Sequence, residues 1–211
     1  LGRSVYQNIK KAVTYLLTCN IGEVLSVFVA LLIWDVSPLS AMQLLWINLV
    51  TDGLPGLALG IYKQEDDVMK IPPKKAGETF FGGGGRRIVL GGILFALSTL
   101  VGYAVGNSVD SASASTMAYL ILSLSQLIFV LEIRSRHSIF RGGITVFMAV
   151  SFAVSVVMVF AVALVPALQG LFGLTQLPWQ MYLAALALST LPSLARECYH
   201  LFYFLKKKAV K

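Results

Sequence analysis

Six apolar runs divide the chain, and their length constrains its fold more than any other feature. They cover residues 12–33, 41–61, 88–106, 115–131, 143–166 and 178–195. A run of roughly 17 to 25 apolar residues matches a helix that crosses a bilayer, and such a helix satisfies its own backbone hydrogen bonds in lipid. Charged residues make up only 13% of the chain, against about a quarter in a soluble domain. We therefore predict one all-α, polytopic membrane helix bundle over residues 1–211, with six transmembrane helices.

The basic residues predict the orientation of these spans. All 17 Lys and Arg residues lie in the amino-terminal segment, the 62–87 and 132–142 connections or the carboxyl-terminal tail. Basic loops stay on the cytoplasmic side, so both termini are expected there, in an integral protein of the plasma membrane. The lipid bilayer, with its anionic inner leaflet, accounts for the net charge of +7. No nucleic-acid partner is needed to explain it.

The second run contains polar residues that point to an ion site. Asn48, Thr51 and Asp52 lie inside the run, which Gly53 and Pro55 then interrupt. Residues three and four apart share a helix face, and a carboxylate within a membrane is costly enough to suggest a function. Proline removes a backbone donor, so we expect the second helix to be broken at Gly53–Pro55. Broken helices of this kind often hold ions in transporters.

The first run adds further oxygen atoms to this set. Asn20 and Glu23 are three residues apart, and a short turn around Pro38 brings the first two spans together as an antiparallel hairpin. Carboxylate, amide and hydroxyl oxygens suit calcium and, as a lesser possibility, manganese, whereas the lack of Cys and His in the set argues against copper and zinc. A helix-packing network with protonated acids is the alternative interpretation. Gln126, in the fourth run, either supplies one more oxygen or bonds to a neighbouring helix.

Several segments resemble a known family. The runs Asn8–Lys11, Thr18–Val24, Leu44–Pro55 and Pro72–Lys74 are similar to the fifth and sixth membrane helices, and the loop after them, of type II P-type calcium-transporting ATPases. Thr116–Ala118 is similar to the eighth helix. The resemblance implies that the six spans are spans five to ten of such a pump, its carboxyl-terminal membrane region.

The resemblance also implies roles for particular residues. Asn20, Glu23, Asn48, Thr51 and Asp52 would be calcium ligands. Gln126 stands where the two-ion pumps carry a glutamate, and this departure argues against two calcium ions per cycle.

The family's catalytic parts have no counterpart in this sequence. It contains no Asp-Lys-Thr-Gly-Thr phosphorylation motif, so the chain alone should not hydrolyse ATP. ATP and magnesium would act through the missing actuator, phosphorylation and nucleotide domains, which are expected partners together with the amino-terminal membrane helices. We expect an ion-binding membrane domain that exports calcium from the cytoplasm. The alternatives are a free-standing channel or ion-coupled secondary transporter, and a non-transporting orphan membrane half.

Overall fold

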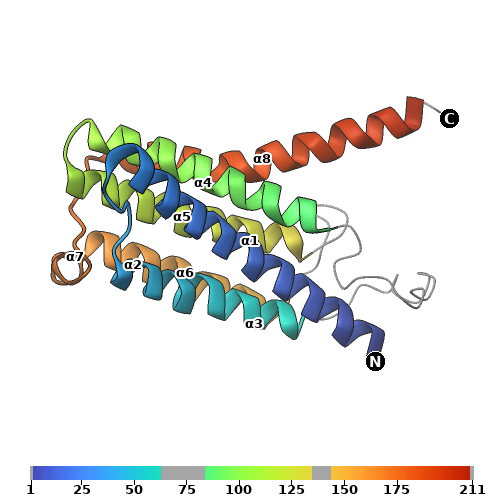
Figure 1. Cartoon of the computed structure of the whole chain (residues 1–211). Helices are drawn as coiled ribbons and strands as arrows, with labels where there is room; N and C mark the ends of the chain where they lie inside the picture. The colour runs from blue at the N-terminus through green and yellow to red at the C-terminus, as the bar shows by residue number, and fades with distance from the viewer. Residues whose placement is uncertain (1, 63–83, 135–143, 210–211) are drawn as a thin grey trace.

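The chain folds into long helices that lie side by side (Figure 1). The computed structural model describes residues 2–62, 84–134 and 144–209. The helices are α1 (Gly2–Trp34), α2 (Ala41–Trp46), the π-helix η1 (Ile47–Gly53), α3 (Leu54–Gly60), α4 (Gly85–Asn107), α5 (Ser111–Ile133), α6 (Val146–Leu164), α7 (Pro166–Phe172) and α8 (Trp179–Ala209). No strand occurs in the described ranges, which confirms the all-α prediction.

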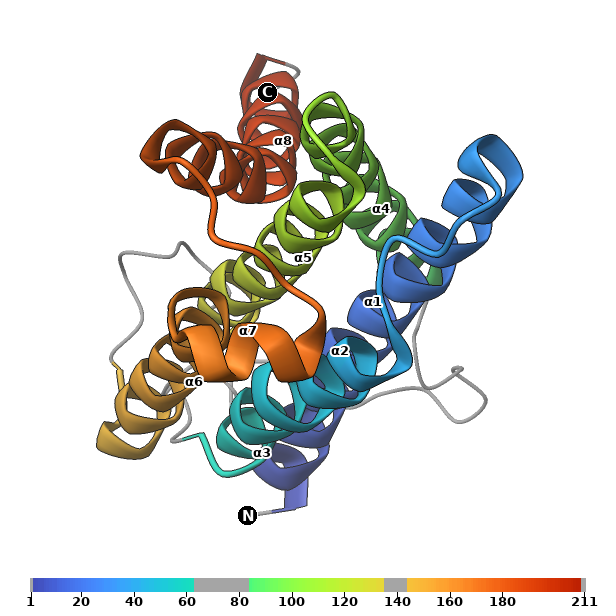
Figure 2. The same ribbon diagram turned by 90° about the vertical axis from the view of Figure 1, so that its left-hand side faces the viewer.

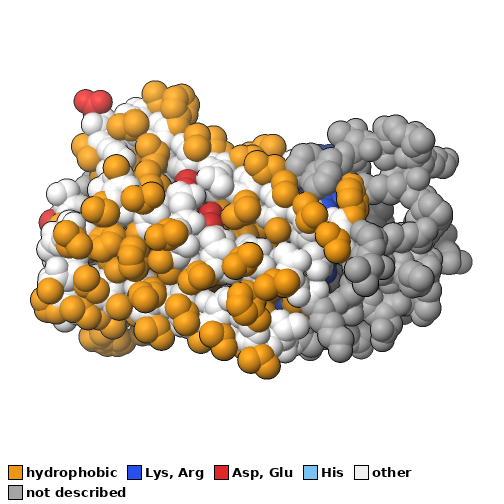
Figure 3. All heavy atoms as spheres, turned by 90° about the horizontal axis from the view of Figure 1, so that it is seen from below, with side chains coloured by type: hydrophobic (Ala, Val, Ile, Leu, Met, Phe, Trp, Pro, Cys, Tyr) orange, Lys and Arg blue, Asp and Glu red, His pale blue; other side chains and the backbone are white. Residues whose placement is uncertain are grey.

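Four described helices are long and apolar enough to cross a membrane: α1, α4, α5 and α6. They confirm four of the predicted spans, with ends within a few residues except at α1, which continues to Gly2. The most apolar part of α5 is 83% buried, compared with 33% for α1 and α6. α5 is therefore the central helix, as the end-on view in Figure 2 shows. Apolar side chains cover the long face seen in Figure 3, as expected for a surface in contact with lipid.

The two remaining predicted spans differ from a plain transmembrane helix. The predicted span 41–61 forms three consecutive helical segments, α2, η1 and α3, with no residue between them. The predicted span 178–195 coincides with α8 from Trp179 onward, but α8 is not among the four helices that are long and apolar enough to cross a membrane. The all-α membrane bundle is confirmed, but six uniform spans are not.

A short outer helix, α7, was not predicted. Pro166 occupies its first turn and Gly173 ends it in the left-handed conformation, with φ 67°. Proline at the start and glycine just past the end are the usual signals of a helix, and both are readable in the sequence. Gln43 ties α7 to α2 by donating to the Phe172 carbonyl at 2.8 Å.

Both ends of the chain lie at the same end of the bundle. Figure 1 shows the start of α1 and the end of α8 at the same end of the bundle, with the turns α1–α2, α4–α5 and α7–α8 at the opposite end. This arrangement fits an even number of crossings. The 63–83 connection, which contains the Pro72–Lys74 part of the family resemblance, lies outside the described residues.

Candidate functional site

Glu23 is the centre of a buried polar cluster formed by α1, η1 and α5. Its side chain is 5% exposed, and each of its two oxygens accepts an amide hydrogen bond. Asn48 Nδ2 donates to Oε2 at 2.9 Å, and Gln126 Nε2 donates to Oε1 at 2.9 Å. The expected meeting of the first two spans at this depth is confirmed, and Gln126 joins it from the centre of the bundle.

Thr51 connects η1 to the same cluster. Its hydroxyl lies 3.1 Å from Gln126 Oε1 and 2.6 Å from the Ile47 carbonyl one turn earlier. Thr51 and Gln126 are both fully buried. Gln126 thus bonds to two neighbouring helical segments, α1 and η1, and its amide also brings one oxygen to the cluster.

Asp52 lies beside this cluster and is 1% exposed. Its Oδ1 is 3.4 Å from the Tyr15 hydroxyl, while Oδ2 has no hydrogen-bond partner among the described residues. A buried carboxylate oxygen without a partner is unusual and calls for a physical reason. An acid that the fold leaves so poorly compensated has capacity for another ligand.

Asn20 lies apart from the other predicted ligands. Its side chain is exposed on α1 and donates to the Leu16 carbonyl of its own helix at 2.7 Å. The structure therefore brings Glu23, Asn48, Thr51 and Gln126 into one hydrogen-bonded cluster, places Asp52 next to it, and leaves Asn20 on the surface.

Pro55 explains the shape of the second span at this site. Because proline has no N–H, it cannot bond to the carbonyl four residues earlier in an α-helix, Thr51, or five residues earlier in a π-helix, Val50. Side chains from other helices take the place of the missing donor. Tyr15 donates to the Thr51 carbonyl at 2.7 Å, and Ser155 on α6 donates to the Val50 carbonyl at 2.8 Å. The predicted break is thus a π-helical stretch held from both sides.

We did not predict from the sequence that Tyr15 and Ser155 belong to the site. Tyr15 lies eight residues before Glu23 and so falls on the same face of α1, a signal that was available. Ser155 is one of several serines in apolar runs, and nothing in its spacing marks it.

The oxygens of the cluster suit a hard cation. Within the described ranges, no group of three His, Cys, Asp or Glu side chains comes together that could hold a metal. A site here must therefore combine the carboxylates of Glu23 and Asp52 with neutral amide, hydroxyl or carbonyl oxygens. Calcium accepts such mixed sets of oxygen ligands.

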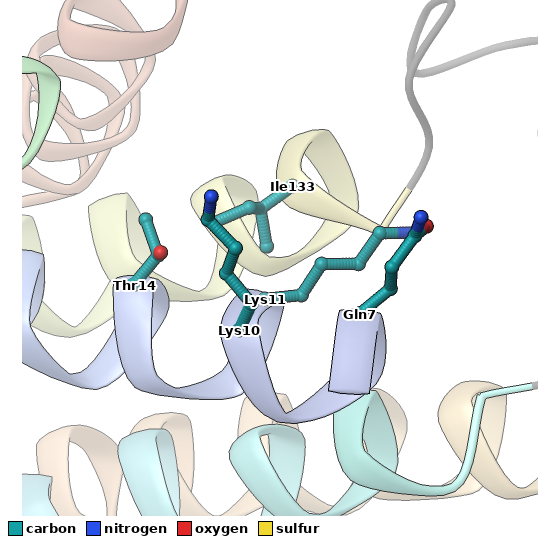
Figure 4. A pocket seen from close by; sticks show the side chains of 5 residues that line it. All are labelled: Gln7, Lys10, Lys11, Thr14 and Ile133. Carbon is teal, nitrogen blue, oxygen red and sulfur yellow. The ribbon is translucent and has the colours of Figure 1, made fainter. Parts of the chain in front are cut away.

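A separate hollow of about 230 Å³ lies between the first turns of α1 and the end of α5. Figure 4 shows its lining residues, Gln7, Lys10, Lys11, Thr14 and Ile133. Two lysine ammonium groups would repel a cation, so this hollow is not part of the oxygen cluster. Lys11 also donates to the Arg134 carbonyl, which ties α1 to α5 at this end.

Comparison with known proteins places the chain in a family. Residues 36–202 match the family described as "Cation transporting ATPase, C-terminus". The chain belongs to this family. The match covers every described element from α2 to most of α8, and it begins after α1.

Individual relatives extend the similarity to α1. Over 93% of its length, the chain is 34% identical to calcium-transporting ATPase 1 of Bacillus cereus and 32% identical to calcium-transporting ATPase 1 of Lactococcus lactis. It is 41% identical to a calcium-transporting ATPase of Bacillus subtilis over 66% of its length. The aligned regions make up only 24%, 23% and 16% of those proteins. The chain thus spans about a quarter or less of the relatives it matches.

Proposed function

We propose that this chain is the ion-binding membrane domain of an ATP-driven pump that exports calcium from the cytoplasm. The observation that carries this proposal is the burial of two acids, Glu23 of α1 and Asp52 of η1, in helical segments that the Asn48–Glu23 hydrogen bond joins. The names of the Bacillus and Lactococcus relatives support calcium as the transported ion. ATP and magnesium would act in domains outside this region.

Each part of the cluster has a role in this proposal. Glu23 and Asp52 supply charge, and Asn48, Thr51 and Gln126 supply neutral oxygens that complete a calcium shell. The two carboxylates would exchange calcium for protons as the pump changes state, because a buried acid that loses its cation is more stable when protonated. Asn20 would join the set only if its side chain turned away from Leu16.

The exposed edge of the site supports a proposal about which helices cover it. Asn20 is exposed and Asn48 is half-buried, and apolar side chains near them on the same helical segments, such as Val24 and Leu49, are exposed as well. A polar amide facing lipid is unfavourable. We therefore assign this edge to contact with the amino-terminal membrane helices of the same pump.

The test is calcium-dependent ATP hydrolysis by the full-length protein that contains this region, in sealed vesicles. Asp52→Asn and Glu23→Gln should abolish both calcium-stimulated hydrolysis and calcium uptake. The matched control is Asp110→Asn, because Asp110 is exposed and caps α5 outside the site. Full activation of the Asp52→Asn protein by calcium would contradict the proposal, and uptake of manganese in preference to calcium would correct the identity of the ion.

A further inference from the structure

A continuous set of contacts joins α8 to η1 through α5 and α1. It starts at an ion pair between Arg196 Nε and Glu132 Oε1, 3.2 Å apart. The Arg196 guanidinium also lies over the ring of Phe129, with its central carbon 4.3 Å from the ring centroid. Arginine stacks well on aromatic rings because its charge is planar and weakly hydrated.

Phe129 also contacts α1, through Tyr15. Its ring lies 5.8 Å from that of Tyr15 and 5.4 Å from that of Phe95, measured between centroids. Phe129 and Tyr15 are both buried, with at most 1% of each residue's surface exposed. The Tyr15 hydroxyl then donates to the Thr51 carbonyl, which Pro55 leaves without a backbone donor. The position of Arg196 is therefore linked to the geometry of η1 through two packed rings.

The ion pair between Glu132 and Arg196 is largely buried, and burial of this kind adds little stability. The Glu132 side chain is 9% exposed and that of Arg196 22%. Glu132 Oε2, Arg196 Nη1 and Ser193 Oγ are buried and have no hydrogen-bond partner among the described residues. Removing two charges from water often costs as much as their attraction returns, so such a pair is weak evidence for a stabilising role. Its planar contact with Phe129 suggests a geometrical role instead.

A second tie fixes the register of α5 and α8. Ser125 donates to the Ser189 carbonyl at 3.2 Å, seven residues before the Glu132–Arg196 pair on each helix. Gln126, next to Ser125, donates to Glu23. The two ties lie two turns apart and in register, so they fix both the rotation and the height of α5. Pro192 lies between Ser189 and Arg196 on α8.

We propose that Arg196 is a positioning residue for the ion site and acts through Phe129 and Tyr15. It holds the Phe129 ring against Tyr15, which keeps the Tyr15 hydroxyl on the Thr51 carbonyl and so fixes the spacing of Thr51 and Asp52 relative to Glu23. This inference rests on the proposed transport of calcium by the cluster.

The test measures the calcium concentration that half-activates ATP hydrolysis, separately from the maximal rate, in the full-length protein in sealed vesicles. Arg196→Gln and Phe129→Leu should each raise this concentration by roughly three- to tenfold while the maximal rate changes by less than about twofold. Arg196→Lys keeps the charge but loses the planar stack, so it should restore only part of the affinity. Arg86→Gln is the control, because Arg86 is an exposed cation at the start of α4.

A double variant separates positioning from folding. Glu132→Gln with Arg196→Gln removes both charges and leaves no unpaired buried acid, so the protein should fold and still show the weaker calcium activation. Loss of thermal stability or of maximal rate with an unchanged half-activating concentration would overturn the inference and leave a structural ion pair. Asp52→Asn is measured in parallel. If the Asp52→Asn protein is still activated by calcium, the proposed function fails as well. If the Asp52→Asn protein is inactive but Arg196→Gln leaves the half-activating calcium concentration unchanged, only this inference is overturned.

Discussion

Two hydroxyl groups define the backbone of the site at the scale of single residues. Tyr15 and Ser155 bond to the Thr51 and Val50 carbonyls, which Pro55 deprives of a partner. A carbonyl buried within a membrane has no water molecule that could donate a hydrogen bond to it. The π-helical stretch therefore depends on side chains that come from α1 and α6, and its stability should respond to them.

Ser155→Ala removes the donor to the Val50 carbonyl and leaves that oxygen buried. We expect the free energy of unfolding to fall by about 1–3 kcal/mol, the usual cost of an unsatisfied buried group. Thermal unfolding in detergent measures the change. Ser108→Ala is the control, because the Ser108 hydroxyl is exposed and donates within its own turn, to the Val105 carbonyl. Equal melting temperatures for the two variants would show that η1 does not need Ser155.

The sequence predicted the acids of the site better than it predicted their supports. Glu23, Asn48, Thr51 and Asp52 could be grouped because helix periodicity places polar residues on common faces within apolar runs. The same rule placed Asn20 with Glu23, but the structure turns its side chain to its own helix. Ser155 could not be found, because its role depends on which helix packs against η1, and local pattern does not contain that information.

At the scale of helices, close approach of α4 and α5 depends on Gly106. A Cβ atom at this position would lie 2.5 Å from the Cα and 2.7 Å from the nitrogen of Ala114. These are backbone atoms, which cannot move aside as a side chain can. Small residues allow helices in lipid to pack closely in this way. The tight turn between the two helices thus requires glycine at position 106.

Gly106→Ala should push α4 and α5 apart at their outer ends and lower the free energy of unfolding by about 1–3 kcal/mol. The control is Gly170→Ala in α7, where an added Cβ meets no atom within 4 Å. This control should be neutral or slightly stabilising, because alanine restricts the unfolded chain. Melting temperatures of the purified variants compare the two. A Gly106→Ala protein as stable as the control would mean that the helices separate without cost.

The helices themselves followed from the sequence to different degrees. Long apolar runs gave α1, α4, α5 and α6, because length and composition alone identify a helix that can cross lipid. α7 was not predicted, because its residues were assigned mostly to a loop, although Pro166 and Gly173 are helix start and stop signals. The π-helical form of η1 could not be foreseen, because proline predicts a disturbed turn but does not determine how the surrounding side chains resolve it.

At the scale of the whole molecule, basic residues gather at the end of the bundle that holds both termini. Among the described cations, Lys10 and Lys11 lie near the start of α1, and Arg86 and Arg87 near the start of α4. The turns at the opposite end contain Asp35 and Asp110 and no basic residue. The positive-inside rule therefore predicts a cytoplasmic location for the end with the termini.

Thiol labelling tests this orientation in sealed, right-side-out vesicles. Cys198 is exposed near the end predicted to be cytoplasmic, whereas Cys19 is fully buried. A membrane-impermeant maleimide should leave the unmodified protein unlabelled until the vesicles are opened, when Cys198 reacts. A variant with Ser108→Cys and Cys198→Ser should react from the outside at once. The reverse pattern would mean that the bundle is inserted with the opposite orientation.

The amide groups around Glu23 give the site two mutually exclusive arrangements. Asn48 and Gln126 each carry a donor and an acceptor on one rotatable group, and here both turn their nitrogens towards the carboxylate. A cation at Glu23 would meet their N–H hydrogens, so both amides must rotate by half a turn to offer oxygens instead. The Thr51 hydroxyl can follow, because it donates or accepts equally well. Switching between the two arrangements would reverse three dipoles and would break the hydrogen bond that Asn48 Nδ2 donates to the Leu44 carbonyl at 2.8 Å.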